Sequence, residues 1–314
     1  MLHAQMSRFL LHTILVALAF CFTHKAESIE KTKSHHNEPS FELITKHPQQ
    51  GSLIIAKVNK HTDVSYLGQP LEKSPAGLVV FGVGREAPES IKLKLSSLGQ
   101  EKTVTLKVRK RDWNIEKVDG LPPSKVTPKG EEVLRRIREE ALLVREARNR
   151  ASGHESFAQQ FIYPAQGRIS GVYGSQRILN GEPKRPHFGL DIANETGTPV
   201  VAPADGVVAL THPDMYYSGG TLIIDHGFGV SSTYIHLNSI DVKNGQEVKQ
   251  GDKIGSIGAT GRATGPHLDW RLNWYNVRLD PGLLLRDRPL KINEKTLLAK
   301  AKSREVRSTN NFNE

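Results

Sequence analysis

The sequence predicts a mainly β protein with an N-terminal β-sandwich-like domain, a linking α-helix and a C-terminal antiparallel β domain. Three observations support this fold class: alternating apolar residues between 91 and 108, an amphipathic stretch between 128 and 151, and glycine-punctuated apolar runs after residue 161. Alternation with a period of two is typical of half-buried strands, and a period of three to four is typical of a helix. The 314 residues are enough for two hydrophobic cores.

Residues 1–28 have the order of a secretory signal peptide. Arg8 precedes an apolar run over residues 9–22, and a polar stretch follows that run. About 14 residues are too few to cross about 30 Å of hydrocarbon comfortably, so we expect cleavage and no stable membrane span after signal removal. The single cysteine, Cys21, would be lost with the signal, which leaves the mature chain without a thiol nucleophile or a disulfide.

A polar linker at residues 29–39 leads into the region 40–120, where we expect the β-sandwich-like domain. Apolar residues there alternate with polar ones on either side of a turn at Gly99: Ile91, Leu93, Leu95, Val104, Leu106 and Val108. This alternation predicts two antiparallel strands, each with one buried face. The region contains no cluster of catalytic residue types, which favours a role as a spacer or docking module.

Residues 121–156 are predicted to hold a linker and a helix. Two prolines after Leu121 interrupt regular structure, and Thr127-Pro128 supplies a helix cap followed by proline at the first helical position. The helix should run to about Ala151, with these apolar residues on one face: Leu134, Ile137, Ala141 and Val144. Its arginines are typical of a solvated face, so we interpret it as a packing helix between the two domains.

Residues 157–290 are expected to form the second β domain, because apolar runs that end in turn residues recur there at 200–208, 222–227 and 251–255. The basic tail, 291–314, is predicted to be a short helix or disordered.

The net charge of +10 favours anionic polymers such as cell wall as partners. Nucleic acid is not an expected partner, because no recognised nucleic-acid motif is present and the chain is predicted to be exported. The sequence does not predict an oligomeric state.

The C-terminal domain contains a small set of residues at spacings that strands can bring together. In an extended chain His187 and Asp191 share one face, and so do His267 and Asp269, while the residues between them turn inward. Two such strands side by side would offer these four side chains to one cation. Three nitrogen or oxygen ligands with an open position are what a catalytic zinc ion requires. Either pair alone is weak evidence for a metal site, since a lone histidine is more often structural.

This part of the sequence resembles the LytM, or lysostaphin-type, family of zinc endopeptidases, which hydrolyse peptidoglycan. The resemblance covers about 160–285 and depends on three motifs: His187-Phe188-Gly189-Leu190-Asp191-Ile192, Ser232-Thr233-Tyr234-Ile235-His236-Leu237 and Thr264-Gly265-Pro266-His267-Leu268-Asp269. It implies that His187, Asp191 and the residue at 269 hold one Zn²⁺ ion, and that His236 and His267 are catalytic histidines outside the metal shell. It also implies export to the periplasm or cell envelope.

The sequence departs from this family at Asp269, because the family pattern is His-x-His and this chain has His267-Leu268-Asp269. Aspartate is itself a zinc ligand, so an active site with His187, Asp191 and Asp269 is chemically sound. A second carboxylate would nevertheless lower the charge of the centre and make the metal a weaker Lewis acid. Because a degenerate site would be expected to lose more than one group, we expect an enzyme that cuts peptide cross-links of peptidoglycan.

Two other functions remain open. The first is a catalytically inactive regulator of a cell-wall amidase, and the second is a wall-binding structural protein. Two further histidines are not assigned to the site. His226 precedes a turn glycine and is interpreted as structural, and His154-Glu155 lacks the second histidine that a helical zinc motif would need at Ala158.

Overall fold

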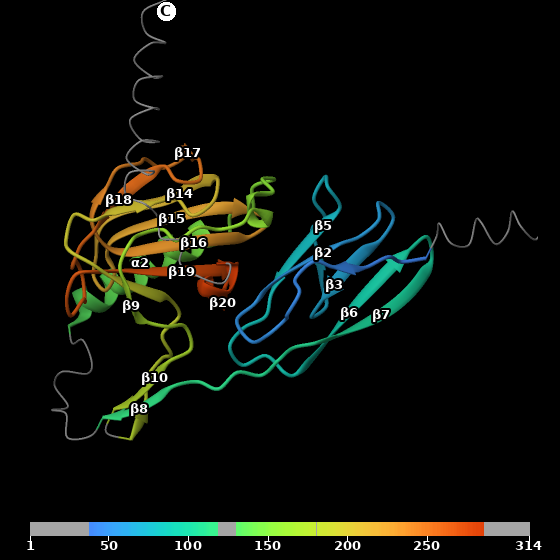
Figure 1. Cartoon of the computed structure of the whole chain (residues 1–314), viewed down its shortest axis with the longest axis horizontal. Coiled ribbons are helices and arrows are strands. Elements are labelled where there is room, and N and C mark those ends of the chain that lie inside the picture. Colours follow the sequence, from blue (N-terminus) through green and yellow to red (C-terminus); the bar gives the residue numbers. More distant parts are fainter. Residues whose placement is uncertain (1–37, 119–129, 180, 286–314) are drawn as a thin grey trace, which may run out of the picture.

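The computed structural model describes residues 38–118, 130–179 and 181–285, and it confirms a mainly β protein. Within these ranges one α-helix, α2 (Glu131–Arg148), links the N-terminal sheets to the C-terminal β domain (Figure 1). The predicted signal segment, the predicted helix start at Thr127-Pro128 and the predicted tail lie outside the described residues. No helix among the described residues has both the length and the apolarity needed to cross a membrane.

Two sheets form the N-terminal domain. One has the order β1-β2-β5 and the other β4-β3-β6-β7. Their strands are β1 (Glu42–Leu43), β2 (Leu53–Lys57), β3 (Asp63–Tyr66), β4 (Gln69–Leu71), β5 (Leu78–Gly82), β6 (Ser90–Ser97) and β7 (Gln100–Lys107). Burial alternates residue by residue along β6, as its sequence predicts. Ile54, Phe81 and Leu93 are fully buried in one cluster that joins the two sheets.

The helix α2 is shorter than predicted, and its apolar contacts with the sheet lie near its C-terminal end. It begins after Gly130 and ends at Arg148. Leu134 and Ala141, which the sequence places on a packing face, are exposed. The contacts with the C-terminal sheet come from Val144 and Ala147, which pack against β14 and β15. The predicted apolar face was therefore wrong in its N-terminal half, where the helix contacts the C-terminal domain through polar groups: Arg136 pairs with Asp214 of β14, and Glu140 accepts from the amide of Tyr216.

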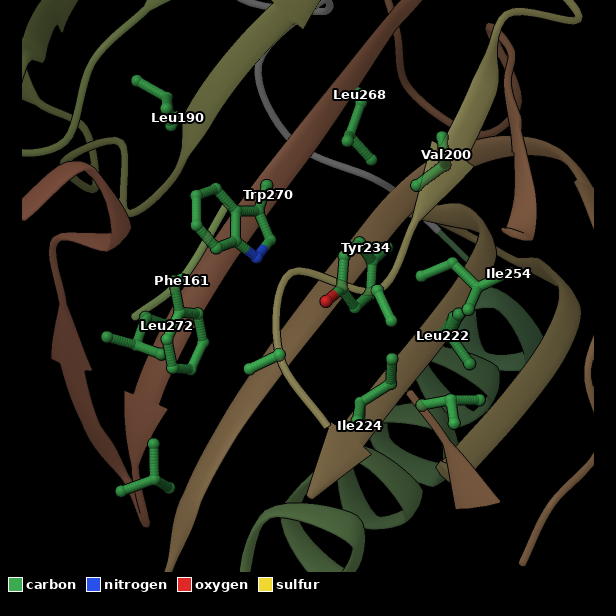
Figure 2. Close-up of a cluster of buried hydrophobic side chains, with 14 of the residues drawn as sticks. Phe161, Leu190, Val200, Leu222, Ile224, Tyr234, Ile254, Leu268, Trp270 and Leu272 are labelled. Carbon is green, nitrogen blue, oxygen red and sulfur yellow. The ribbon is translucent and has the colours of Figure 1, made fainter. Parts of the chain in front are cut away.

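One antiparallel sheet dominates the C-terminal domain, with the central order β17-β14-β15-β16-β19-β12-β9; β20 pairs with β19, and β18 joins β13 to β16. Its strands are β9 (Arg168–Gly171), β12 (Leu190–Ala193), β13 (Pro199–Val201), β14 (Gly206–Met215), β15 (Gly219–Gly227), β16 (Val230–Ile240), β17 (Glu247–Val248), β18 (Lys253–Ile257), β19 (His267–Trp274) and β20 (Val277–Leu279). One face of the sheet is apolar. Figure 2 shows Leu222, Tyr234 and Trp270, from three neighbouring strands, gathered in this core.

The two domains are joined by a strand that the sequence did not predict. In this strand, β8 (Ile115–Val118), the backbone pairs in parallel with β10 (Gln176–Leu179), which in turn pairs with β11 (Glu182–Pro183) (Figure 1). Just before β8, Trp113 lies beneath the guanidinium of Arg111, whose centre is 4.6 Å from the ring centroid. Arg111 also contacts Asp280 of the C-terminal domain, with 2.7 Å between Nη1 and Oδ2. The linker is therefore held against the domain that follows it.

His226 is structural, as its place before a turn glycine predicts. The side chain is fully buried, and its Nδ1 and Nε2 atoms lie 2.7 Å from the carbonyl oxygen of Asp205 and from Oγ of Ser232. A carbonyl oxygen only accepts, so Nδ1 carries the proton and Nε2 accepts from Ser232. The Tyr234 hydroxyl lies 2.8 Å from the Ser232 Oγ and continues the network. Burial lowers the pKa of His226 to about 4.

This buried histidine should make the stability of the protein depend on pH. The unfolded chain binds a proton at His226 with a pKa near 6.5, so stability is fully present above that pH and is lost as pH falls toward about 4. Urea unfolding should show about 2 kcal/mol less stability at pH 5 than at pH 7 from this group. His226→Gln should flatten this dependence, whereas a variant at the exposed His47 should keep it. Equal slopes in the two variants would contradict the assignment.

Candidate metal centre

Asp191 and Asp269 lie side by side on neighbouring strands. They are directly paired in the register between β12 and β19. Leu190 and Trp270, the next residues along each strand, are buried in the core, so the two carboxylates project from the opposite face. The strand parity in the sequence correctly predicts this arrangement.

His187 reaches the same place by a different route from the predicted one. The expected strand does not extend to it, because β12 begins at Leu190 and residues 184–188 are irregular. The segment nevertheless places Nε2 of His187 3.1 Å from Oδ1 of Asp191. One ligand atom from each of His187, Asp191 and Asp269 lies within 4.8 Å of the others. The three residues are therefore close enough to share one cation.

Two glycines make room for the carboxylates. A Cβ atom on Gly171 of β9 would lie 2.2 Å from Oδ2 of Asp191, and one on Gly189 would lie 1.9 Å from Oδ1 of Asp269. Neither distance is possible between non-bonded atoms, so any larger residue would displace the carboxylate. The sequence motifs did not predict this role for either glycine, although Gly189 lies within the first motif.

These residues fit a divalent metal ion. Nε2 of His187 and Oδ1 of Asp191 are both buried and lack a hydrogen-bond partner, although they are in contact with each other. Unsatisfied buried polar atoms are costly, and a cation between them would satisfy both. Burial alone would lower the pKa of His187, but the Asp191 and Asp269 carboxylates outweigh it and raise this pKa. The donor set of one nitrogen and two carboxylates is one that zinc accepts.

Asp269 is also the partner of a partly buried cation, Arg271, for which the sequence predicts no role. The Nη2 atom of Arg271 lies 2.5 Å from Oδ2 of Asp269, and its Nε lies 3.0 Å from Oδ1. Burial would raise the pKa of Asp269, but the charge and hydrogen bonds of Arg271 lower it. The signal for this pair was the spacing of two residues on one strand, which puts both side chains on the same face.

His236 and His267 form a separate pair next to the carboxylates. Their ring centroids are 4.8 Å apart. The Nδ1 of His236 lies 2.8 Å from the Thr260 carbonyl oxygen, and the Nδ1 of His267 lies 2.8 Å from that of Gly265. Since carbonyl oxygens only accept, both Nδ1 atoms donate and both Nε2 atoms are left with a lone pair in the neutral rings. Burial lowers the pKa of His236, which favours this neutral form.

Comparison with known proteins agrees with this geometry. Residues 185–281 match Peptidase family M23. The peptidoglycan DD-endopeptidase ShyA of Vibrio cholerae is 43% identical over 118 residues, which is 36% of this chain and 26% of ShyA. The cell division protein DipM of Caulobacter vibrioides is 35% identical over 157 residues, which is 48% of this chain and 24% of DipM. The matched part thus spans about a quarter of these relatives.

One solved structure is similar over most of the chain. It is a protein from Pseudomonas aeruginosa assigned to peptidase M23, with 29% identity and a TM-score of 0.60 over 77% of this chain and 96% of that one. The antiparallel sheet carries a His/Asp group that could hold a metal ion, beside a histidine pair, within the residues that match this peptidase family. Residues 185–281 of this chain form an M23 peptidase domain.

A side chain at position 171 should weaken metal binding. Gly171→Ala is expected to push Asp191 away from His187 and to lower zinc affinity, measured by calorimetry on the full chain, by about 10-fold or more. Gly153→Ala is a matched control, because no atom lies within 4 Å of its added Cβ. Unchanged affinity in Gly171→Ala would show that Asp191 is not needed for the metal.

Asp269 should be important for stability even without metal. Asp269→Ala leaves the partly buried Arg271 without its carboxylate, which should cost about 2 kcal/mol in urea unfolding of the metal-free protein. The double variant Asp269→Ala/Arg271→Met should regain part of this loss, because it removes the unpaired charge as well. Asp63→Ala is the control, since the Asp63 carboxylate is 84% exposed and its ion pair with Lys73 is long, at 3.8 Å. A double variant no more stable than Asp269→Ala would contradict this account.

Proposed function

We propose that this protein is an exported zinc metalloendopeptidase that hydrolyses peptide cross-links of bacterial peptidoglycan. The observation that carries the proposal is the pair of unsatisfied buried atoms, Nε2 of His187 and Oδ1 of Asp191, close to Asp269 and next to two oriented histidines. The M23 domain and the similarity to a peptidoglycan DD-endopeptidase support peptidoglycan as the substrate.

His187, Asp191 and Asp269 are the proposed ligands of one Zn²⁺ ion. Zinc at this position would acidify a water molecule and polarise the scissile carbonyl. Asp269 can serve while it remains bound to Arg271, because a carboxylate has about four lone-pair directions and the guanidinium occupies only some of them.

The positive charge of Arg271 offsets the loss of Lewis acidity that a second carboxylate would cause at the metal centre. A divalent ion with a neutral imidazole and two carboxylates has a net charge of zero, that is, +2 − 2. The guanidinium restores one positive charge beside the ion, which is the net charge of a site with two histidines and one aspartate. With this compensation, an active centre that has Asp269 as a ligand is chemically sound.

The histidine pair is the proposed acid–base machinery. His236 is buried and neutral near pH 7, and its Nε2 lone pair is free to take a proton from the attacking water. His267 is more exposed and is assigned to orienting that water or to stabilising the charge that develops on the scissile carbonyl oxygen. Both rings are held by backbone carbonyls, so their orientation is set before substrate binds.

The proposal can be tested on purified peptidoglycan, with released peptides measured by mass spectrometry and zinc measured on the same samples. His236→Ala and His267→Ala should keep zinc and lose about 10²- to 10⁴-fold in rate. His187→Ala should lose both zinc and activity. His154→Ala, at an exposed position outside the site, is the control. A wild-type chain that holds no zinc and releases no peptide would rule out the enzyme.

A second candidate is a regulator of a cell-wall amidase. The ion pair between Asp269 and Arg271 favours it, because Arg271 already neutralises one proposed ligand without a metal. The similarity to a cell division protein is compatible with this function. In the peptidoglycan assay a regulator would stimulate an added amidase after treatment with a chelator, and the enzyme would not.

A further inference from the structure

Arg148, the last residue of α2, is a buried cation that has no anionic partner among the residues the structure describes. The residue is 6% exposed, and its Nε is buried with no hydrogen-bond partner. The one hydrogen bond of its guanidinium runs from Nη2 to the Thr233 hydroxyl and is long, at 3.4 Å. A buried charge is normally paired, since an unpaired one is among the most costly groups a fold can contain.

Two more arginines lie close to it. Burial and the charges of Arg278 and Arg271 together hold the pKa of Arg148 well below its ordinary value. Arg278 is itself largely buried, and its Nη1 lies 3.3 Å from the amide oxygen of Asn273. Burial, followed by the charge of Arg271, lowers its pKa to about 10.

The charges of this group do not balance. Among the described residues, Asp269 is the one carboxylate in an ion pair with any of the three guanidiniums, and its partner is Arg271. The carboxylate of Asp191 also acts on Arg271, so three cations face two anions, an excess of 3 − 2 = 1 positive charge in a partly buried space. Repulsion between guanidiniums in such a space favours the binding of an anion.

The arginine group lies directly beside the proposed metal centre. Along β19 the residues on one face are His267, Asp269 and Arg271 in turn, and Thr233 of β16 is the paired neighbour of Arg271. The arginines and the histidine pair therefore lie on opposite sides of the carboxylates. A ligand that spans the metal centre would reach both.

We infer that Arg148, Arg271 and Arg278 form an anion site that binds a carboxylate of the peptide substrate, next to the bond to be cut. This inference rests on the proposed function and names a feature of its substrate. The planar fork of a guanidinium matches the two oxygens of a carboxylate. Asp269 pairs with Arg271, whereas Arg148 and Arg278 donate only to neutral groups among the described residues, so their charges are available to a substrate carboxylate. Preferred substrates are thus peptides with a free carboxylate near the scissile bond.

The first arm of the test measures anion binding without hydrolysis. The unfolding temperature of the chelator-treated full chain is followed in 0 to about 20 mM inorganic phosphate at constant ionic strength. The wild type should gain about 2–4 °C at tenfold saturation. Arg148→Met and Arg278→Met should gain little. Arg145→Met, on an exposed face of the same helix, should respond as the wild type does.

The unfolding temperature measured without phosphate distinguishes an anion-binding role of Arg148 from a structural one. Removal of an uncompensated buried charge should leave Arg148→Met at least as stable as the wild type, whereas loss of a structural arginine would lower its unfolding temperature. Arg148→Lys keeps a positive charge and should retain part of the phosphate response. A response of the same size in wild type, Arg148→Met and Arg145→Met would overturn the inference.

The second arm uses two stem-like peptides that differ only in a free carboxylate or a carboxamide, with affinity measured by calorimetry. The wild type should bind the carboxylate peptide about 10- to 100-fold more tightly, and Arg148→Met should bind the two within about threefold. No preference in the wild type would overturn the inference. If the preference is present but neither peptide is cut, the anion site stands and the proposal of hydrolysis fails.

Discussion

The ion pair between Asp269 and Arg271 is the interaction on which the rest of the site depends. Asp269 departs from the histidine that the family pattern has at this position, and a carboxylate there is tolerable in a buried sheet face because a guanidinium lies 2.5 Å away. The pair also requires Gly189 on the adjacent chain segment, since any side chain there would displace the carboxylate. Neither residue of the pair can change alone without leaving a buried charge unpaired.

The sequence predicted those parts of the site that depend on local geometry. The period of two along β12 and β19 correctly assigned Leu190 and Trp270 to the core and the aspartates to the opposite face. His187 was predicted on a strand and lies in an irregular segment instead. Its position depends on backbone bonds to Gly174 and Ser175, about twelve residues earlier, which no local pattern reveals.

Contacts between distant segments account for what the sequence did not predict. Arg148 was interpreted as part of a solvated helix face, since a helical wheel cannot show that the last residue of α2 reaches Thr233 of β16. The strand β8 was missed because its few residues gain a partner only when β10, about 60 residues later, lies beside them. In both cases the determining contact is tertiary, and local propensity carries no information about it.

The two histidines beside the carboxylates are held in a way that bears on how this site tolerates sequence change. Each ring is oriented by a main-chain carbonyl, at Thr260 and at Gly265, and His236 has a positive φ of 65° that the surrounding sheet imposes. A carbonyl is present whatever side chain its residue bears. Side chains at neighbouring positions can therefore change during evolution while both rings keep their orientation. That orientation depends on the path of the backbone and not on the side chains of particular partner residues.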